Sequence, residues 1–258
     1  MKKLILPVYL STKRIINLSE NIFFRHRGIM FQSSSSIFAV AAHPDDEMLG
    51  CGGTLARLAA LGTEIHILLL GEGPLARSSE TDDARAHACL SAKRAAQVIG
   101  VNEANVHFAS LPDNRFDTIA LLDIVQHIEA LAEQVQPDLV FTHHAGDMNQ
   151  DHRLTHQAVM TAFRPLPGTK PVTLLGFEVL SSTEYTPPHT APAFCPNVFV
   201  DISATLETKC HALAEYASEM RPWPHPRSME AVRHLAALRG CFCGHEAAEA
   251  FILYRTVL

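Results

Sequence analysis

The chain has 258 residues, of which 47% are hydrophobic and 19% charged, and its formal net charge is −6 at pH 7. This length suits one large domain with a sizeable core, and the composition excludes a disordered chain. The negative charge argues against a nucleic-acid-binding protein. Six Cys lie scattered without the spacing of a disulfide framework, so we expect reduced thiols and a cytoplasmic protein.

The N-terminal extension differs in charge from the rest of the chain. Residues 1–27 carry six Lys or Arg against one Glu. Their apolar stretches are too short to span a bilayer. Two interpretations remain open: residues 1–30 contact an anionic membrane surface, which would make the protein peripheral to the inner face of the membrane, or they pack on the domain or on a second subunit. We favour packing and expect a homo-oligomer.

The first strand of the domain is predicted at Ile37–Ala42, where an apolar run enters a loop of one imidazole and three carboxylates. His43, Asp45 and Asp46 therefore follow a strand end, where open α/β sheets place their ligands. One imidazole and one carboxylate make two of the three protein ligands of a catalytic zinc site, and the second carboxylate is free to accept a proton from water. A solvated loop that caps the helix after it is the alternative.

A later strand, Asp138–Thr142, leads into a second His-rich loop, and His152 opens the helix after that loop. Loops at neighbouring strand ends can converge on one metal, so His152 is the predicted third ligand. We expect Asp151, which is adjacent in the chain, to hold the other ring nitrogen of His152. For any one of the fifteen His, a surface or core histidine is the alternative.

Three motifs stand out in these loops: His43-Pro44-Asp45-Asp46-Glu47, Gly50-x-Gly52-Gly53-Thr54 and Asn149-x-Asp151-His152-Arg153. From Ile37 to the C-terminus the chain resembles the PIG-L / LmbE-like family of metal-dependent N-acetylglucosaminyl deacetylases. The resemblance implies a Rossmann-like fold and Zn²⁺, with another divalent metal as the alternative. It also implies that His43, Asp46 and His152 bind the metal and that Asp45 is the general base, a choice that spacing alone does not make.

One position departs from the family pattern. Many members carry a His three residues before the third ligand, and this chain has Asn149. An Asn amide donates a hydrogen bond to an oxyanion but delivers no proton. We therefore expect Asn149 to take part in catalysis as a donor. The acid is then either Asp45 after it has gained a proton or a histidine, with His143, His144 and His225 as candidates.

The remaining pattern alternates strands with helices and predicts a single α/β domain at residues 37–258, after an extension at 1–36. Its Rossmann-like sheet should be mostly parallel with helices on both faces. Further strands are expected at Glu64–Leu70, Asn105–Phe108, Val172–Glu178, Asn197–Ile202 and Ala250–Tyr254. Helices are expected at 81–100, 118–135, 154–163 and 203–219, and a last one ending near 238.

The loops after the other strands should supply substrate contacts. The family resemblance implies an Arg in the loop after the second strand. The Pro-Asp-Asn loop after the third strand offers groups for sugar hydroxyls, although turn chemistry explains it equally well. The Pro-rich segment Met220–Ser228 offers Arg side chains for phosphate, unless it is only a rigid connection between helices. The predicted contacts are Arg77, Asp113, Asn114, His144, His225 and Arg227.

The function that we expect is amide hydrolysis: removal of the acetyl group from a small-molecule N-acetylated amino sugar, free or linked to a nucleotide or lipid. One alternative is a non-catalytic module that binds a nucleotide sugar. The glycines at Gly50–Gly53 do not match the dinucleotide fingerprint, which argues against it. Two others are a structural metal site that joins two loops and an amidase acting on a thiol-sugar conjugate.

Overall fold

The computed structural model describes residues 36–71, 73, 82–187 and 189–257. The basic extension and Arg77 lie outside these residues, so the predictions made for them stay predictions, as does the domain boundary after residue 36. Within the described part of the chain, no helix has the length and apolar character needed to cross a membrane.

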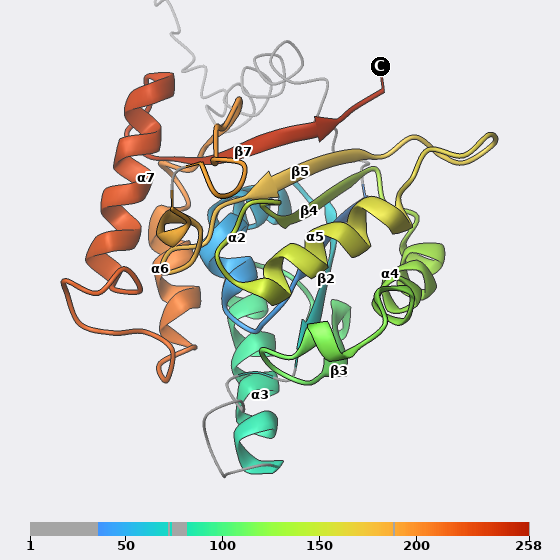
Figure 1. Cartoon of the computed structure of the whole chain (residues 1–258). Coiled ribbons are helices and arrows are strands. Elements are labelled where there is room, and N and C mark those ends of the chain that lie inside the picture. The colour runs from blue at the N-terminus through green and yellow to red at the C-terminus, as the bar shows by residue number, and fades with distance from the viewer. Residues whose placement is uncertain (1–35, 72, 74–81, 188, 258) are drawn as a thin grey trace, which may run out of the picture. The chain divides into compact units, whose positions relative to one another are not determined.

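A seven-stranded sheet in the order β3-β2-β1-β4-β5-β7-β6 forms the centre of the described part (Figure 1). The first five strands in this order are parallel, and β7 is antiparallel to both β5 and β6. The strands are β1 (Ser36–Ala41), β2 (Glu64–Gly71), β3 (Val106–Leu111), β4 (Leu139–His143), β5 (Thr173–Phe177), β6 (Val198–Asp201) and β7 (Ala248–Arg255). The predicted mostly parallel sheet is confirmed.

The strand order reverses between β1 and β4, which are hydrogen-bonded neighbours. From β1 the chain proceeds through β2 and β3 in one direction, and from β4 through β5 in the other. At such a switch point the two strand-end loops turn to opposite faces and leave a crevice between them. The loops that follow β1 and β4 are the two that the sequence singled out.

Helices cover both faces of the sheet (Figure 1). One face packs on α4 (Leu121–Val135) and α5 (Gln150–Ala162), with Phe38 and Val40 of β1 buried in that layer. The other face is covered by α2 (Asp46–Ala60), which contacts β1, β2, β7 and α6. Beside α2 lies α6 (Leu206–Ala214), which also contacts α3 (Asp82–Val98) and α7 (Met229–Cys243).

Several element boundaries differ from the predictions. The predicted helix at 203–219 is shorter, and ends at Ala214. The strand predicted to end at Phe108 continues to Leu111, because it pairs with β2 as far as Gly71. Helix α5 begins at Gln150, because the side chain of Asn149 accepts a hydrogen bond from the backbone N of Asp151 and caps the helix.

Candidate active site

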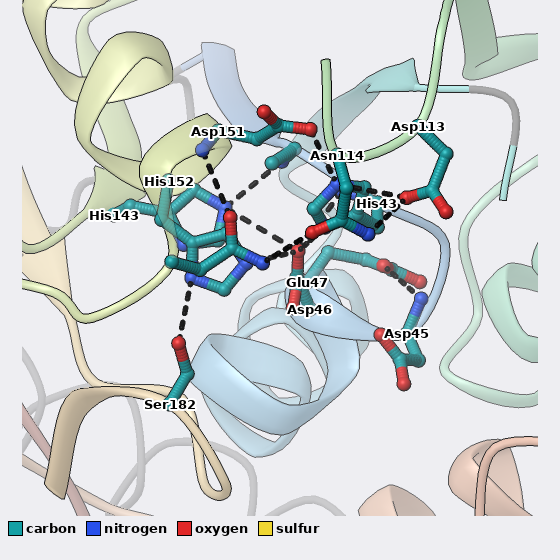
Figure 2. A network of polar contacts seen from close by, with 12 residues as sticks. His43, Asp45, Asp46, Glu47, Asp113, Asn114, His143, Asp151, His152 and Ser182 are labelled. Carbon is teal, nitrogen blue, oxygen red and sulfur yellow. Dashed lines mark hydrogen bonds and ion pairs between the residues drawn. The ribbon is translucent and has the colours of Figure 1, made fainter. Parts of the chain in front are cut away.

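The two loops at the switch point bring His43, Asp46 and His152 together (Figure 2). His43 follows β1, Asp46 is the first residue of α2, and His152 lies in the first turn of α5. The carboxylate oxygen Oδ2 of Asp46 lies 3.2 Å from Nδ1 of His43 and 3.1 Å from Nε2 of His152. Figure 2 shows the two imidazoles on either side of this carboxylate.

Each imidazole turns its second nitrogen toward another carboxylate. Nε2 of His43 lies 3.0 Å from Asp151 and 3.3 Å from Asp113. Nδ1 of His152 lies 3.1 Å from Asp147. Carboxylates in this position fix the tautomer and orientation of a metal-binding His. The arrangement therefore leaves one nitrogen of each ring directed at Asp46.

The carboxylate behind His152 is not the one expected from the sequence. Asp151 was predicted to hold His152, but its side chain meets His43, and Asp147 takes the expected place. Consecutive residues of a helix point in directions about 100° apart, so neighbours cannot face each other. Asp151 instead reaches back to the β1 loop, where its other oxygen accepts a hydrogen bond from the backbone N of Phe116 at 3.0 Å.

The residues present fit a divalent cation. Asp46 Oδ1 and His152 Nε2 are both buried and make no well-formed hydrogen bond among the described residues, although Nε2 lies 3.1 Å from Asp46 Oδ2. Such atoms are uncommon in folded proteins, and these two lie within the His–Asp–His group. Potential ligand atoms of His43, Asp46 and His152 lie within 4.8 Å of one another, and imidazole with carboxylate is a donor set for zinc. His43, Asp113 and Asp151 form a second such group, but it holds neither unpartnered atom.

The ionisation of these groups follows their neighbours. Burial opposes charge on His43, but hydrogen bonds with Asp151 and Asp46 outweigh burial and raise its pKa to about 10. Burial likewise opposes charge on His152, and Asp46 and Asp147 raise its pKa to about 9. Burial would raise the pKa of the Asp46 carboxyl, but His152 and His43 outweigh burial and hold this pKa well below its usual range. The buried Asp46 carboxylate thus favours positive charge on the two rings, and a bound cation would take the place of their protons.

Asp45 lies beside this group and differs from Asp46 in its environment. Its backbone has a φ of 110°, which is uncommon for a residue other than glycine. The side chain of Glu47 accepts a hydrogen bond from the backbone N of Asp45 at 3.1 Å. Burial raises the pKa of Asp45 well above its usual range, although Arg227 lowers it. A carboxylate with a raised pKa in a strained loop is a candidate proton acceptor.

Asn149, Asn114 and Asp113 form a chain of side chains at the rim of the site. The amide of Asn149 donates to Asn114 at 3.5 Å, and the amide of Asn114 donates to Asp113 at 3.0 Å. Asp113 in turn faces His43. The structure thus brings three of the predicted residues together. Asn149 uses its carbonyl oxygen as the cap of α5 and has its NH₂ group left to donate.

The other predicted histidines lie in different surroundings. His143 is buried, accepts a hydrogen bond from the backbone N of Ala42 at 2.8 Å and stacks on His152 with ring centroids 3.9 Å apart. Both ring nitrogens of His144 contact protein atoms, Tyr254 and the backbone oxygen of Pro192. This geometry does not favour His144 as the acid, and its role stays a prediction.

The Pro-rich segment Met220–Ser228 reaches the site through one side chain. Arg227 donates to Asp45 at 2.9 Å. His225 is exposed, and its Nδ1 accepts a hydrogen bond from the backbone N of Arg227. The structure therefore joins Arg227, but not His225, directly to the predicted general base.

Two buried carboxylates of the site, Asp147 and Glu47, were given no role from the sequence. Asp147 accepts hydrogen bonds from Ser182 and, at 2.6 Å, from Thr183, which lie in the segment after β5. These contacts and His152 outweigh burial and lower the pKa of Asp147 to about 2. Glu47 contacts the hydroxyl of Tyr216, and burial raises its pKa to about 7. Ser182, Thr183 and Tyr216 are distant in the chain from the carboxylates that they contact, so no local sequence pattern reveals these contacts.

Sequence comparison agrees with this geometry. Residues 38–163 match the family model PIG-L, described as GlcNAc-PI de-N-acetylase. The chain is 31% identical over 191 residues to the uncharacterized deacetylase YaiS of Escherichia coli (strain K12), covering 70% of this chain and 90% of that one. It is 23% identical over 234 residues to the diacetylchitobiose deacetylase of Thermococcus kodakarensis, covering 85% and 83%.

Solved structures share the fold. The conserved protein TT1542 of Thermus thermophilus superposes with a TM-score of 0.68 at 25% identity, covering 87% of this chain and 96% of that one. GalB, a 4-carboxy-2-hydroxymuconate hydratase from Pseudomonas putida, gives 0.70 at 22%, covering 87% and 98%, so the fold alone does not fix the reaction. The family model and the curated relatives together define the class as deacetylases. This chain belongs to the PIG-L / LmbE-like family of deacetylases.

Proposed function

We propose that the chain hydrolyses the acetamido group of an N-acetylated amino sugar and releases acetate and the free amine. The observation that carries this proposal is the convergence of His43, Asp46 and His152 with Asp45 beside them. The family supports deacetylation, and the diacetylchitobiose deacetylase among the relatives supports a sugar substrate.

The proposed metal ligands are His43 through Nδ1, Asp46 through its carboxylate and His152 through Nε2. Zn²⁺ suits this donor set, and another divalent metal remains the alternative. Asp151 and Asp147 would hold the two imidazoles from behind. A metal bound there supplies a Lewis acid that polarises the acetyl carbonyl and makes water more acidic.

Asp45 would act first as the base and then as the acid. Its carboxylate accepts a proton from the attacking water while the oxygen forms a bond to the acetyl carbon. The NH₂ group of Asn149 donates a hydrogen bond to the oxyanion that develops. Asp45 then returns the proton to the nitrogen as the C–N bond breaks. A raised pKa suits a carboxylate that must hold this proton between the two steps.

Asp113 and Asn114 would meet the sugar at the same rim. Both lie within the chain of contacts between Asn149 and His43. Asn114 is exposed and has its amide near the site, so it is the better placed for a sugar hydroxyl. Asp113 would orient His43 as well as accept from the sugar. The proposed sugar is free or linked to a nucleotide or lipid, and Arg77 is a further proposed contact.

Acetate release tests the proposal. The protein is incubated with a panel of N-acetylated sugars and nucleotide sugars, with and without a chelator, and acetate is measured. Release that stops with the chelator and returns with zinc supports a zinc-dependent deacetylase. No release from protein that contains one metal per chain would contradict the reaction as proposed for these substrates.

A substitution at Asp45 separates this proposal from the alternatives. In Asp45→Asn, turnover should fall about 10²- to 10⁴-fold, because the general base is lost, while metal content stays at its wild-type value. Unchanged ligand binding with no turnover in either protein would instead indicate a module that binds a nucleotide sugar. Cleavage of thiol-sugar conjugates alone would indicate the amidase.

The remaining parts of the proposal concern where the protein works. All six Cys are free thiols, which supports a reducing, cytoplasmic setting. Self-association as a homo-oligomer and a membrane contact through residues 1–30 remain part of the proposal, and sedimentation with and without anionic vesicles tests both.

A further inference from the structure

The side chain of Arg227 is held by three separate segments of the chain. Its Nη1 donates to Oδ2 of Asp45 at 2.9 Å, in the loop after β1, and to Glu219 at 3.2 Å, in the segment after α6. Its Nε donates to Ser181 at 2.7 Å, in the segment after β5. The side chain is 24% exposed. A guanidinium held from three directions has one orientation, so it can impose that orientation on a partner.

The partner on which this acts is Asp45. The backbone N of Asp45 is held by Glu47, and its carboxylate oxygen Oδ2 by Arg227. In the described part of the chain, the second oxygen, Oδ1, has no hydrogen-bond partner, and this atom is not completely buried. Asp45 is therefore fixed at its backbone and at one oxygen. The side chain is only 2% exposed, so Oδ1 is the one oxygen that can contact a water molecule entering the site.

We propose that Arg227 is a positioning residue, which holds the Asp45 carboxylate so that Oδ1 faces the attacking water. The inference rests on the proposed deacetylase function, in which Asp45 is the base. Holding a reacting group in its productive geometry is worth large factors in rate, and a misplacement of about 1 Å can cost about 100-fold. Removing Arg227 should thus lower turnover without removing any group that contacts the sugar.

The competing role for this side chain is to bind a phosphate or carboxylate of the substrate. Two carboxylates, Asp45 and Glu219, already contact Nη1, and the hydroxyl of Ser181 accepts from Nε. An anionic substrate that bound Nη1 or Nε would have to replace these contacts. The geometry therefore favours positioning, and the anion role becomes one outcome of the test.

The test compares Arg227→Ala and Arg227→Lys with wild type on a neutral sugar and on its phosphorylated form. We expect kcat to fall about 100-fold in Arg227→Ala on both substrates, with KM little changed. Added guanidinium ion should restore part of the lost kcat, whereas sodium at equal ionic strength should not. Arg227→Lys should recover less, because an ammonium cannot reproduce the fork of contacts. An unchanged kcat with KM raised only for the phosphorylated sugar would overturn the proposal.

Arg221→Ala is the matched control. Arg221 lies in the same Pro-rich segment, but its guanidinium donates to the backbone oxygens of Ser218 and Met220. This variant should keep wild-type kcat, and all variants should keep wild-type metal content. An equal loss of kcat in Arg221→Ala would mean that the segment as a whole matters, and would overturn the specific role of Arg227.

A structural readout separates this inference from the proposed function. If wild type releases no acetate from any sugar, the deacetylase proposal fails on its own. Crystal structures of metal-loaded wild type and Arg227→Ala then still decide the geometry. A displaced or disordered Asp45 carboxylate in the variant supports the positioning role, and an Asp45 carboxylate in its wild-type place overturns it.

Discussion

Asp151 lies one residue before His152 in the chain, yet its carboxylate meets His43, with Oδ2 3.0 Å from Nε2. The same side chain accepts a hydrogen bond from the backbone N of Phe116 through Oδ1. Asp151 thus connects the loop after β1, the turn after β3 and the start of α5. It can orient His43 only while these three segments keep their places.

The first prediction is that Asp151→Asn weakens metal binding. The amide keeps an oxygen for Phe116, but loses the charge that fixes the proton on Nε2 of His43. Loss of such a carboxylate behind a metal-binding His costs about 10- to 100-fold in metal affinity. Competition with a chromophoric chelator measures this. Asp117→Asn, at an exposed site in the same region, is the control, and equal affinities in both variants would contradict the prediction.

The second prediction separates two roles of Asn149. Its carbonyl oxygen caps α5 and its NH₂ group is the proposed oxyanion donor. Asn149→Ser keeps a capping oxygen and loses the amide donor, so kcat should fall about 10²- to 10³-fold while the melting temperature is kept. Asn149→Ala loses both and should also be destabilised by about 1 kcal/mol. Acetate assays and urea unfolding measure the two effects, and a fully active Asn149→Ser would exclude the donor role.

The third prediction concerns the close packing of α2. A Cβ at Gly50 would lie 2.3 Å from the ring of Phe177, whereas one at Gly52 would lie 3.2 Å from Sδ of Met48 and 3.6 Å from Cγ of Lys209 and Cβ of Met48. Gly50→Ala should therefore destabilise the protein by about 1–3 kcal/mol. Gly52→Ala should be nearly neutral, because Ala also favours a helix. Urea unfolding of both variants checks this, and equal midpoints would contradict it.

How much of this site was visible in the sequence depends on the kind of contact. Apolar runs that enter polar loops predicted the strands before His43 and His152, because burial of a parallel strand leaves a local pattern. That both loops lie at one switch point required the strand order, which follows from pairing between distant segments. The choice between Asp45 and Asp46 as the proposed metal ligand came from the family resemblance rather than from spacing.

The supporting contacts were not visible, because each joins residues far apart in the chain. Asp147 is held by Ser182 and Thr183, more than thirty residues later. Arg227 was predicted to meet the substrate, and only the folded chain shows that it reaches Asp45. Composition and periodicity carry no information about which distant side chain fills such a place.

The last prediction concerns a buried ion pair that clamps α2. Nζ of Lys209 lies 2.6 Å from Glu249 and donates to the backbone oxygen of Leu49, while Glu249 accepts from the backbone N of Gly53 and of Thr54. The side chains of Lys209 and Glu249 are only 6% and 4% exposed. Lys209→Met leaves Glu249 charged, buried and without its cation, which should cost about 3–5 kcal/mol.

Lys170→Met is the matched control for the clamp. Lys170 pairs with Asp138 at 2.7 Å, but these side chains are 41% and 40% exposed. A solvated pair contributes about 0–1 kcal/mol, so this variant should unfold near the wild-type urea midpoint. Because the clamp holds the helix that begins at Asp46, Lys209→Met should also lose metal at lower urea concentrations than wild type. Similar unfolding midpoints for the two variants would contradict the prediction. They would mean that water reaches Glu249 in the folded protein and solvates its charge.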